Sequence, residues 1–457
     1  MMKLGLFLVF LIVCSLPATA GTFAPHVDFS AGTFPSGVAT GDFNHDGKPD
    51  LAVSDQQGST VSVLIGNGDG TFQSAVSYAV GVFPQAVTVG DFNQDGNLDL
   101  AVVEVGTLQV LLGHGDGTFG TAANFSCVAC FRVATADFNG DGILDVATAG
   151  GNANSGCLEI FLGNGDGTFK SGVLYPVQAN PLAIAVGDFN GDHKVDVVVG
   201  NDFSFTISVL IGNGDGTFQS AVNYNVGDCV EGIVVGDFNG DQKLDIAIAS
   251  LARAQVGILL GNGDGTFGSV VGYGAAAFPF AITIGDFNHD GKLDVATANS
   301  FGSVSVLLGN GDGSLQPMRN YPVPVGNPES ITSADLNGDG ELDLVTGDIF
   351  VNCVSVLLNT GGTVLSSTSS PNPSVVGQTV TFTVTVMASV GTGRNPTGTV
   401  TFKDGNVTLG TAPVISGKAT LGNSTLSEGT HTIKAHYSGN LSFNPNHAPP
   451  LTQVVNP

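Results

Sequence analysis

The chain has 457 residues, a formal net charge of −26 and 66 glycines. The negative charge excludes a nucleic-acid-binding protein, because such a protein needs a basic face. The glycine content, together with 42% hydrophobic residues, indicates many short strands joined by tight turns and excludes a mainly helical fold.

Residues 1–20 have the pattern of a secretory signal sequence. Lys3 supplies the charged n-region, residues 4–13 form the apolar core, and Ala18-Thr19-Ala20 is a suitable cleavage site. The apolar run is too short for a transmembrane segment, and no other stretch of the sequence is suited to be one. We therefore expect a secreted or cell-surface protein that is cleaved near Ala20, in a compartment that permits disulfides.

A nonapeptide, D-x-N-x-D-x-x-x-D, recurs seven times along the chain. A fixed period of this length predicts a repeat architecture in which each repeat is one supersecondary unit. Successive copies start 49, 46, 51, 49, 49 and 49 residues apart, at Asp42, Asp91, Asp137, Asp188, Asp237, Asp286 and Asp335.

Each period contains four short apolar runs separated by turn residues. In the first period the runs are 36–41, 51–54, 61–65 and 78–80, and the nonapeptide lies between the first two. Such runs between Gly, Asn and Asp turns are typical of an antiparallel meander. We therefore predict an all-β fold, with a seven-bladed β-propeller over residues 21–360.

A second motif, G-N-G-D-G-T-F, follows the third run of the period, as at 66–72, but the seventh period lacks it. A matching fragment, Gly21-Thr22-Phe23, begins the mature chain instead. The N-terminal segment is therefore predicted to supply the fourth strand of the last blade and to close the ring. Asn-Gly and Asp-Gly steps are typical of hairpin turns, so we interpret the aspartate of this motif as structural, with metal ligation as the alternative.

The nonapeptides are predicted to bind Ca²⁺, up to seven ions at one per blade. Positions one, three, five and nine carry side-chain oxygens and position seven offers a backbone carbonyl, a set that suits a hard cation with many oxygen ligands. Magnesium requires stricter geometry, and zinc prefers His or Cys. Ordinary turns are the alternative, which seven complete ligand sets disfavour. The predicted metal ligands are Asp42, Asn44, Asp46, Lys48, Asp50, Asp91, Asn93, Asp95, Asn97, Asp99, Asp137, Asn139, Asp141, Ile143, Asp145, Asp188, Asn190, Asp192, Lys194, Asp196, Asp237, Asn239, Asp241, Lys243, Asp245, Asp286, Asn288, Asp290, Lys292, Asp294, Asp335, Asn337, Asp339, Glu341 and Asp343.

Position six of the nonapeptide is predicted to have a positive φ, since five copies place Gly there. The fourth and fifth copies carry His193 and Gln242 instead. A residue with a side chain costs on the order of 1 kcal/mol in the left-handed region. We therefore expect these two sites to be the weakest.

Beyond residue 360 the repeat stops, and apolar and polar residues alternate, as at 379–386. This period of two predicts half-buried strands. With further strand patterns at 398–405, 429–437 and 451–455, the segment 361–457 is predicted to form a small β-sandwich.

The seven aspartate loops, each placed between two strands, resemble the FG-GAP/VCBS repeats of integrin α-subunit propellers and their bacterial relatives. This resemblance covers residues 21 to about 360, and implies calcium bound in loops on one face and ligands on the opposite face. The sequence has no counterpart of the inserted integrin adhesion domain, so integrin ligands do not follow. The segments 396–405, 429–433 and 437–439 resemble bacterial Ig-like domains, which implies a spacer or an adhesive module.

The cysteines outside the signal sequence offer no zinc or redox site. Cys127-x-x-Cys130 lacks both a second CxxC and a nearby His pair, and no βαβ context surrounds it. We expect a local or inter-loop disulfide and a leftover thiol among Cys127, Cys130, Cys157, Cys229 and Cys353.

No catalytic site is expected, because the sequence shows no nucleophile motif, phosphate loop or triad. The face opposite the aspartate loops has few basic residues, Arg132 and Arg253, but many phenylalanines. We expect these rings to fill the core between blades, and a recognition surface is the alternative. The phenylalanines are Phe83, Phe131, Phe203, Phe205, Phe278, Phe280, Phe301 and Phe350.

Together these patterns predict an exported, monomeric, calcium-binding scaffold for adhesion or for binding an extracellular protein or glycan. A carbohydrate-binding lectin is the alternative. A polysaccharide-degrading enzyme built on a propeller ranks third.

Overall fold

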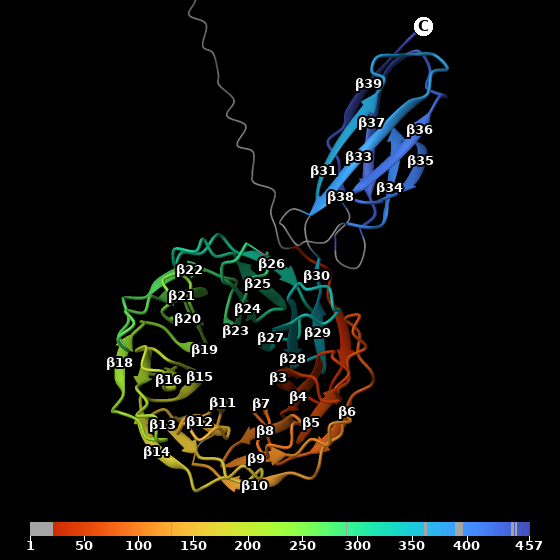
Figure 1. Cartoon of the computed structure of the whole chain (residues 1–457). Coiled ribbons are helices and arrows are strands. Elements are labelled where there is room, and N and C mark those ends of the chain that lie inside the picture. Colours follow the sequence, from red (N-terminus) through yellow and green to blue (C-terminus); the bar gives the residue numbers. More distant parts are fainter. Residues whose placement is uncertain are drawn as a thin grey trace, which may run out of the picture. The chain divides into compact units, whose positions relative to one another are not determined.

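The computed structural model describes residues 22–128, 130–288, 290–360, 363–388, 396–439, 443 and 446–457. The predicted signal sequence at 1–20 lies outside these residues. Every element in them is a β-strand (Figure 1), and they contain no helix long and apolar enough to cross a membrane. The chain divides into two compact units, one formed by Phe23–Asn359 and one that contains Thr360–Pro457.

The larger unit contains seven four-stranded antiparallel sheets in its described residues, and six of them are built from consecutive strands. The strands of these six sheets are β3 (Pro35–Gly41), β4 (Asp50–Asp55), β5 (Thr60–Leu64) and β6 (Val76–Ala79); β7 (Ala86–Gly90), β8 (Asp99–Glu104), β9 (Thr107–Leu111) and β10 (Ala123–Ser126); β11 (Arg132–Ala136), β12 (Asp145–Asn152), β13 (Ser155–Phe161) and β14 (Val173–Val177); β15 (Pro181–Gly187), β16 (Asp196–Asn201), β17 (Thr206–Leu210) and β18 (Val222–Asn225); β19 (Val230–Gly236), β20 (Asp245–Ser250), β21 (Gln255–Leu259) and β22 (Val271–Gly274); β23 (Pro279–Gly285), β24 (Asp294–Asn299), β25 (Ser303–Leu307) and β26 (Arg319–Pro322).

The seventh sheet joins the two ends of the unit. Its order is β2-β29-β28-β27, in which the N-terminal strand pairs with a strand more than 300 residues later in the chain. The predicted closure by the N-terminal strand is therefore confirmed. A short sheet of β1 and β30 follows it. The bounds of these strands are β1 (Thr22–Phe23), β2 (Val27–Ser30), β27 (Pro328–Ala334), β28 (Asp343–Asp348), β29 (Cys353–Leu357) and β30 (Asn359–Thr360).

The first strands of the sheets contact one another in a closed ring. β3 contacts β7, and the contacts continue through β11, β15, β19, β23 and β27 back to β3. Figure 1 shows the sheets arranged around a central opening. This arrangement is a β-propeller, as the sequence predicts. Because successive strands run in opposite directions, the aspartate loops and the G-N-G-D-G-T-F turns lie on one face, and the remaining turns lie on the other.

The core of the propeller lies between neighbouring sheets. Leu51 and Leu64 of one sheet share a buried cluster with Val345 and Val354 of the sheet beside it. The phenylalanine that ends the second motif joins this layer: Phe119 packs edge-on against Phe43 of the preceding blade, with ring centroids 5.4 Å apart. Apolar side chains, which dominate this layer, therefore hold each sheet to the next.

The smaller unit contains two packed sheets, β31-β33-β36 and β32-β39-β37-β34-β35, with β38 beside β37. Between them lies a core that includes Phe382, Phe402 and Tyr437, so the predicted sandwich is present. The strand bounds are β31 (Thr363–Ser370), β32 (Ser374–Val375), β33 (Val380–Ala388), β34 (Thr399–Asp404), β35 (Val407–Pro413), β36 (Lys418–Asn423), β37 (Gly429–Tyr437), β38 (Asn446–His447) and β39 (Leu451–Asn456).

A buried polar residue ends the second strand of several blades. In the first blade it is Asp55, which is fully buried and accepts hydrogen bonds from Thr60 Oγ1 at 2.8 Å and Ser62 Oγ at 2.7 Å. Burial raises the pKa of Asp55 to about 6, against the lowering effect of these hydroxyls. The equivalent residue of the fourth blade, Asn201, instead donates to Ser208 Oγ at 2.9 Å.

Asp55→Asn should stabilise the propeller at neutral pH and have little effect near pH 4. Because the folded pKa exceeds the ordinary value of 3.8, the folded state holds a proton that the unfolded state has released, and stability falls as pH rises from about 4 to 6. The gain above pH 7 is at most ~3 kcal/mol, since one pKa unit corresponds to about 1.4 kcal/mol. Thermal unfolding at both pH values measures it.

The matched control is Asn201→Asp, which should lower the melting temperature at pH 7.5 more than at pH 4. An equal gain for Asp55→Asn at both pH values would show that burial of the charge is not the cause.

Candidate functional site

Each nonapeptide forms the loop between the first and second strands of a blade. In the first blade the Asp46 amide donates to Asp42 Oδ1 at 3.1 Å and to Asn44 Oδ1 at 3.0 Å, and the Gly47 amide donates to Asp42 Oδ2 at 2.9 Å. The Lys48 amide donates to Asp46 Oδ1 at 3.0 Å. These bonds fold the loop tightly and bring the side chains of positions one, three and five together.

The ninth residue is placed differently. Asp50 begins β4, is fully buried, and accepts the Phe43 amide on Oδ2 at 2.8 Å and the Gly66 amide on Oδ1 at 2.7 Å. This aspartate therefore links its own loop to the second motif, a role that the sequence analysis did not predict. The same pair of bonds occurs at Asp99, Asp145, Asp196, Asp245, Asp294 and Asp343.

The surroundings of the ninth aspartates disfavour their ionised form. Burial raises their pKa values, and the carboxylates at positions five and one raise them further, to about 6 at Asp99, about 7 at Asp294 and about 8 at Asp343. A nearby divalent cation would offset this repulsion. Each carboxylate oxygen has a second lone pair, so the ninth aspartate can serve both the fold and an ion.

The oxygen donors of the loop fit calcium, which accepts mixed carboxylate, amide, carbonyl and water ligands. Side chains at positions one, three, five and nine and the carbonyl at position seven would hold the ion. Calcium binding stays a prediction for all seven loops.

Position six has a positive φ in all seven loops, as predicted, from 63° at His193 and 66° at Gln242 to 86° at Gly96. Position four also has a positive φ, for example 57° at His45 and 58° at Gln94. The sequence analysis missed this second position, although four copies carry Gly there.

The second motif forms a self-contained turn. Asp69 Oδ1 accepts the Thr71 amide at 3.0 Å and the Thr71 hydroxyl at 2.5 Å, which lowers the pKa of Asp69. The structural interpretation of this aspartate is therefore supported. The motif also reaches the preceding blade: in the second blade, the Gly117 amide donates to the Phe43 carbonyl of the first blade at 2.9 Å.

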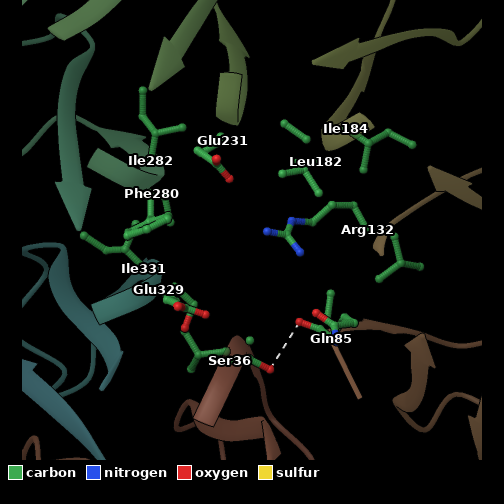
Figure 2. Close-up of a pocket in the computed structure, with 18 of the residues that line it drawn as sticks. Ser36, Gln85, Arg132, Leu182, Ile184, Glu231, Phe280, Ile282, Glu329 and Ile331 are labelled. Atoms are coloured by element: carbon green, nitrogen blue, oxygen red, sulfur yellow. Dashed lines mark hydrogen bonds between the residues drawn. The ribbon is translucent and has the colours of Figure 1, made fainter. Parts of the chain in front are cut away.

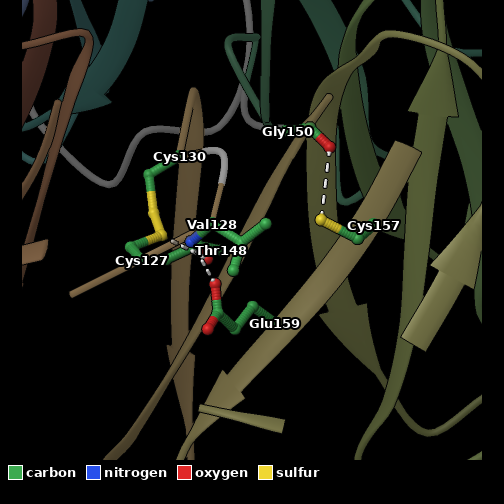
Figure 3. Close-up of a disulfide and its surroundings, with 7 residues drawn as sticks. All are labelled: Cys127, Val128, Cys130, Thr148, Gly150, Cys157 and Glu159. Atoms are coloured by element: carbon green, nitrogen blue, oxygen red, sulfur yellow. Dashed lines mark hydrogen bonds between the residues drawn. A yellow bond between two sulfur atoms is a disulfide. The ribbon is translucent and has the colours of Figure 1, made fainter. Parts of the chain in front are cut away.

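A disulfide joins Cys127 and Cys130 (Figure 3), as expected for a local pair. The Val128 amide between them donates to Glu159 Oε2 at 2.8 Å. Glu159 lies close enough to both sulfurs for a metal site, but sulfurs joined in a disulfide are not thiolate ligands. Three described cysteines, Cys157, Cys229 and Cys353, are free thiols rather than one, and burial raises the pKa of Cys229 and of Cys353 to about 12.

The face opposite the aspartate loops is rich in exposed apolar side chains. The expectation that the phenylalanines fill the core is wrong for six of the eight, whose exposed fractions range from 42% at Phe278 to 69% at Phe301. The six are Phe83, Phe203, Phe205, Phe278, Phe301 and Phe350. They lie in turns between strands two and three or between blades, where neighbouring sheets cannot cover them.

On the same face, the central opening begins with a cavity of about 180 Å³ that all seven first strands line (Figure 2). Each blade contributes one residue to the outer rim of this cavity. The sequence analysis singled out Arg132 but missed the two glutamates, although both occupy the same position of their repeats. The seven residues are Ser36, Gln85, Arg132, Leu182, Glu231, Phe280 and Glu329.

The family model for the FG-GAP-like repeat matches six overlapping segments, at 46–102, 91–148, 137–199, 188–248, 237–297 and 286–346. The chain belongs to the FG-GAP-like repeat family. Residues 367–456 match the bacterial Ig-like domain (group 3). No curated protein sequence matches the chain.

Solved structures resemble this FG-GAP protein at low identity. A crystal structure of BBS1N in complex with ARL6DN is 14% identical; the match covers 74% of this chain and 96% of that chain, with a TM-score of 0.50. This likeness concerns the fold alone. A structure of an Agrocybe aegerita lectin that recognises non-reducing terminal N-acetylglucosamine is 20% identical; the match covers 71% of this chain and 86% of that chain, with a TM-score of 0.44.

Chelation should lower the melting temperature of this FG-GAP protein markedly. An ion that binds only the folded state stabilises it by mass action, by ~4 kcal/mol per site when free calcium is a thousand times the Kd. Differential scanning calorimetry with calcium and with EDTA measures the shift. Calcium added back in excess is the control, and a melting curve indifferent to EDTA would contradict calcium binding.

Replacing the two residues that have side chains at position six should increase the calcium affinity of the FG-GAP loops that contain them. His193→Gly and Gln242→Gly each remove a left-handed side-chain residue, worth ~1 kcal/mol, or about fivefold in affinity. Calorimetric titration of metal-free protein with calcium measures the change. Gly47→His is the reverse control and should weaken its loop, whereas unchanged affinity in all three variants would rule the idea out.

Proposed function

We propose that this protein is an exported, calcium-stabilised scaffold that binds an extracellular protein or glycan through the face opposite its aspartate loops. The exposed phenylalanines on that face carry the proposal. Two of them, Phe278 and Phe301, contact each other with ring centroids 6.0 Å apart. Exposed apolar clusters are typical of interaction sites, and aromatic side chains are enriched among the residues that contribute most to binding at protein interfaces.

The backbone of this face adds support. Phe83 and Phe278, each followed by proline, have φ values of 58° and 55°, and Phe301 has a φ of 68°. A residue held in the left-handed region costs on the order of 1–3 kcal/mol, and such strain is concentrated at functional sites. At the position of Phe83 and Phe278, the fourth and seventh blades carry Asn180 and Asn327, which tolerate this conformation better.

The composition of the face favours a protein over a glycan. Exposed valines such as Val82, Val105 and Val325 accompany the phenylalanines, and neither residue type offers a hydrogen-bonding group to a sugar hydroxyl. Apolar side chains of a partner protein would bury this surface with a favourable loss of hydration.

The remaining modules suit an exported scaffold. The propeller buries the aspartate loops' anchoring carboxylates away from the proposed contact face, so metal binding and partner binding are separate tasks. FG-GAP repeats and bacterial Ig-like domains are typical of binding and adhesive scaffolds, and the signal-like sequence at 1–20 agrees with export.

The double substitution Phe83→Asn and Phe278→Asn should abolish partner binding without loss of stability. Asparagine removes the aromatic contact but accepts the left-handed backbone, so the melting temperature should stay constant or rise. Extracellular-protein and glycan arrays, probed with calcium and with EDTA, identify the partner and measure its binding.

The matched control is Val76→Thr with Val222→Thr, which removes two valines, each 54% exposed, on fourth strands. Partners that bind the wild type and both double variants equally would place recognition elsewhere. Turnover of any arrayed glycan would favour the enzyme alternative.

A further inference from the structure

The seven side chains around the mouth of the central opening are directed there by the fold. Ser36, Leu182, Glu231, Phe280 and Glu329 each lie at a shift in register between the first and second strands of their blades. A bulge of this kind removes a residue from the ladder, aims its side chain anew, and is common beside functional sites. Five equivalent bulges therefore present five side chains of four chemical types to one cavity.

Opposite charges stand on opposite walls of this cavity. Glu231 and Glu329 lie on β19 and β27, on either side of Phe280 on β23, and Arg132 extends from β11 across the opening (Figure 2). Among the described residues Arg132 makes no ion pair, and its one hydrogen bond goes from Nη1 to the Phe131 carbonyl at 3.0 Å.

The charged groups influence one another across the cavity. Burial raises the pKa of Glu231 to about 7; Asp202 raises it further, whereas Arg132 lowers it. Burial also raises the pKa of Glu329, and Arg132 again opposes this effect. Burial in turn lowers the pKa of Arg132, which both glutamates counteract. The groups are thus coupled but not in contact, and space remains between them.

We propose that this cavity binds a small zwitterion, an amino-carboxylate of the size of a free amino acid. Its ammonium group lies between Glu231 and Glu329 beside the Phe280 ring, which adds a cation–π attraction. Its carboxylate pairs with Arg132, whose planar guanidinium matches a carboxylate with two parallel hydrogen bonds.

The placement of the charges, rather than their sum, favours a zwitterion over a singly charged ligand, because Glu231 and Glu329 stand across the opening from Arg132. A simple amine would leave Arg132 without a partner, and a simple carboxylate would leave both glutamates without one; an unpaired, partly buried charge is costly. The cavity is smaller than the ~300–1,000 Å³ of pockets for drug-sized ligands. Leu182 and Ile331 in its wall give an apolar side chain a place to pack. This site is independent of the partner surface formed by the exposed phenylalanines.

Binding of matched small molecules tests the site directly. L-leucine, 4-aminobutyrate and 6-aminohexanoate carry both charges at increasing separation, isopentylamine carries the positive charge alone, and 4-methylpentanoate the negative charge alone. Titration calorimetry on the calcium-loaded full chain should show at least one zwitterion binding tenfold or more tightly than both singly charged compounds. The tripeptide Leu-Gly-Gly distinguishes a free amino acid from a peptide as the source.

Substitutions test which residues of the cavity bind the carboxylate and which bind the ammonium group. Arg132→Met should remove the advantage of the zwitterion over the amine, and Glu231→Gln with Glu329→Gln should remove its advantage over the carboxylate. If Arg132→Met fails to fold, Arg132→Lys takes its place. This variant keeps the positive charge but loses the planar guanidinium, so it should reduce the advantage of the zwitterion over the amine. Glu428→Gln, an exposed position in the Ig-like unit, is the control and should change nothing.

Two results would overturn the proposal. One is that no zwitterion binds better than the amine or the carboxylate. The other is that a zwitterion binds better, but the Arg132 and Glu231/Glu329 variants still bind it more tightly than the singly charged compounds by the same factor. That result would place the site elsewhere. Both results leave the partner surface of phenylalanines untouched, because that surface is tested by its own variants.

Discussion

The propeller depends on a buried carboxylate that accepts two backbone amides at once. The carboxylate of Asp50 accepts the Phe43 amide of its own loop and the Gly66 amide of the neighbouring turn. The carbonyl of Phe43 in turn accepts the Gly117 amide of the next blade. Loop, turn and adjacent blade are therefore connected through two residues, Asp50 and Phe43. Hydrogen bonds to a charged acceptor are among the stronger ones, and they weaken when the carboxylate is protonated. Burial and two neighbouring aspartates oppose ionisation of Asp50, so a cation bound in the loop would help to keep these bonds strong.

The two faces divide the work of the molecule. On one face, short polar loops are tightened by their own side chains and are nearly alike in every repeat. On the other, equivalent positions differ from blade to blade: Phe83 and Phe278 correspond to Asn180 and Asn327, and the channel residues differ in charge. The repeats thus share one backbone geometry. Their residues are nearly constant on the face of the aspartate loops and vary from blade to blade on the opposite face.

The sequence was sufficient to predict the architecture because its signals were repeated. Seven nonapeptides, a fixed period and the displaced Gly21-Thr22-Phe23 fragment predicted the propeller and its closure. The loop conformation at His193 and Gln242 was also predictable, since Gly in the other copies reveals the required φ. The exposure of Phe278 and Phe301 was not, because an apolar turn residue looks the same whether a neighbouring sheet covers it or not.

The cavity at the central opening could not be predicted from the sequence, for a different reason. Glu231 and Glu329 are 98 residues apart, and only the closed ring places both opposite Arg132. A one-residue shift in register decides whether each side chain points into the opening, and single-sequence patterns do not specify such a shift. The role of Asp50 was hidden similarly, since a ligand and a structural anchor have the same side chain.

Closure by β2 imposes an order on assembly. Asp28 and Ser355, which are hydrogen-bonded at 2.9 Å, are separated by 327 positions. The entropic cost of closing a loop grows with its length, and contacts between distant residues slow folding. Strand β2 therefore lacks its partner until β29, near the end of the propeller sequence, is available. During that interval β2 is an unpaired strand able to join other chains, so a protein of this design is most exposed to intermolecular strand exchange just before the ring closes.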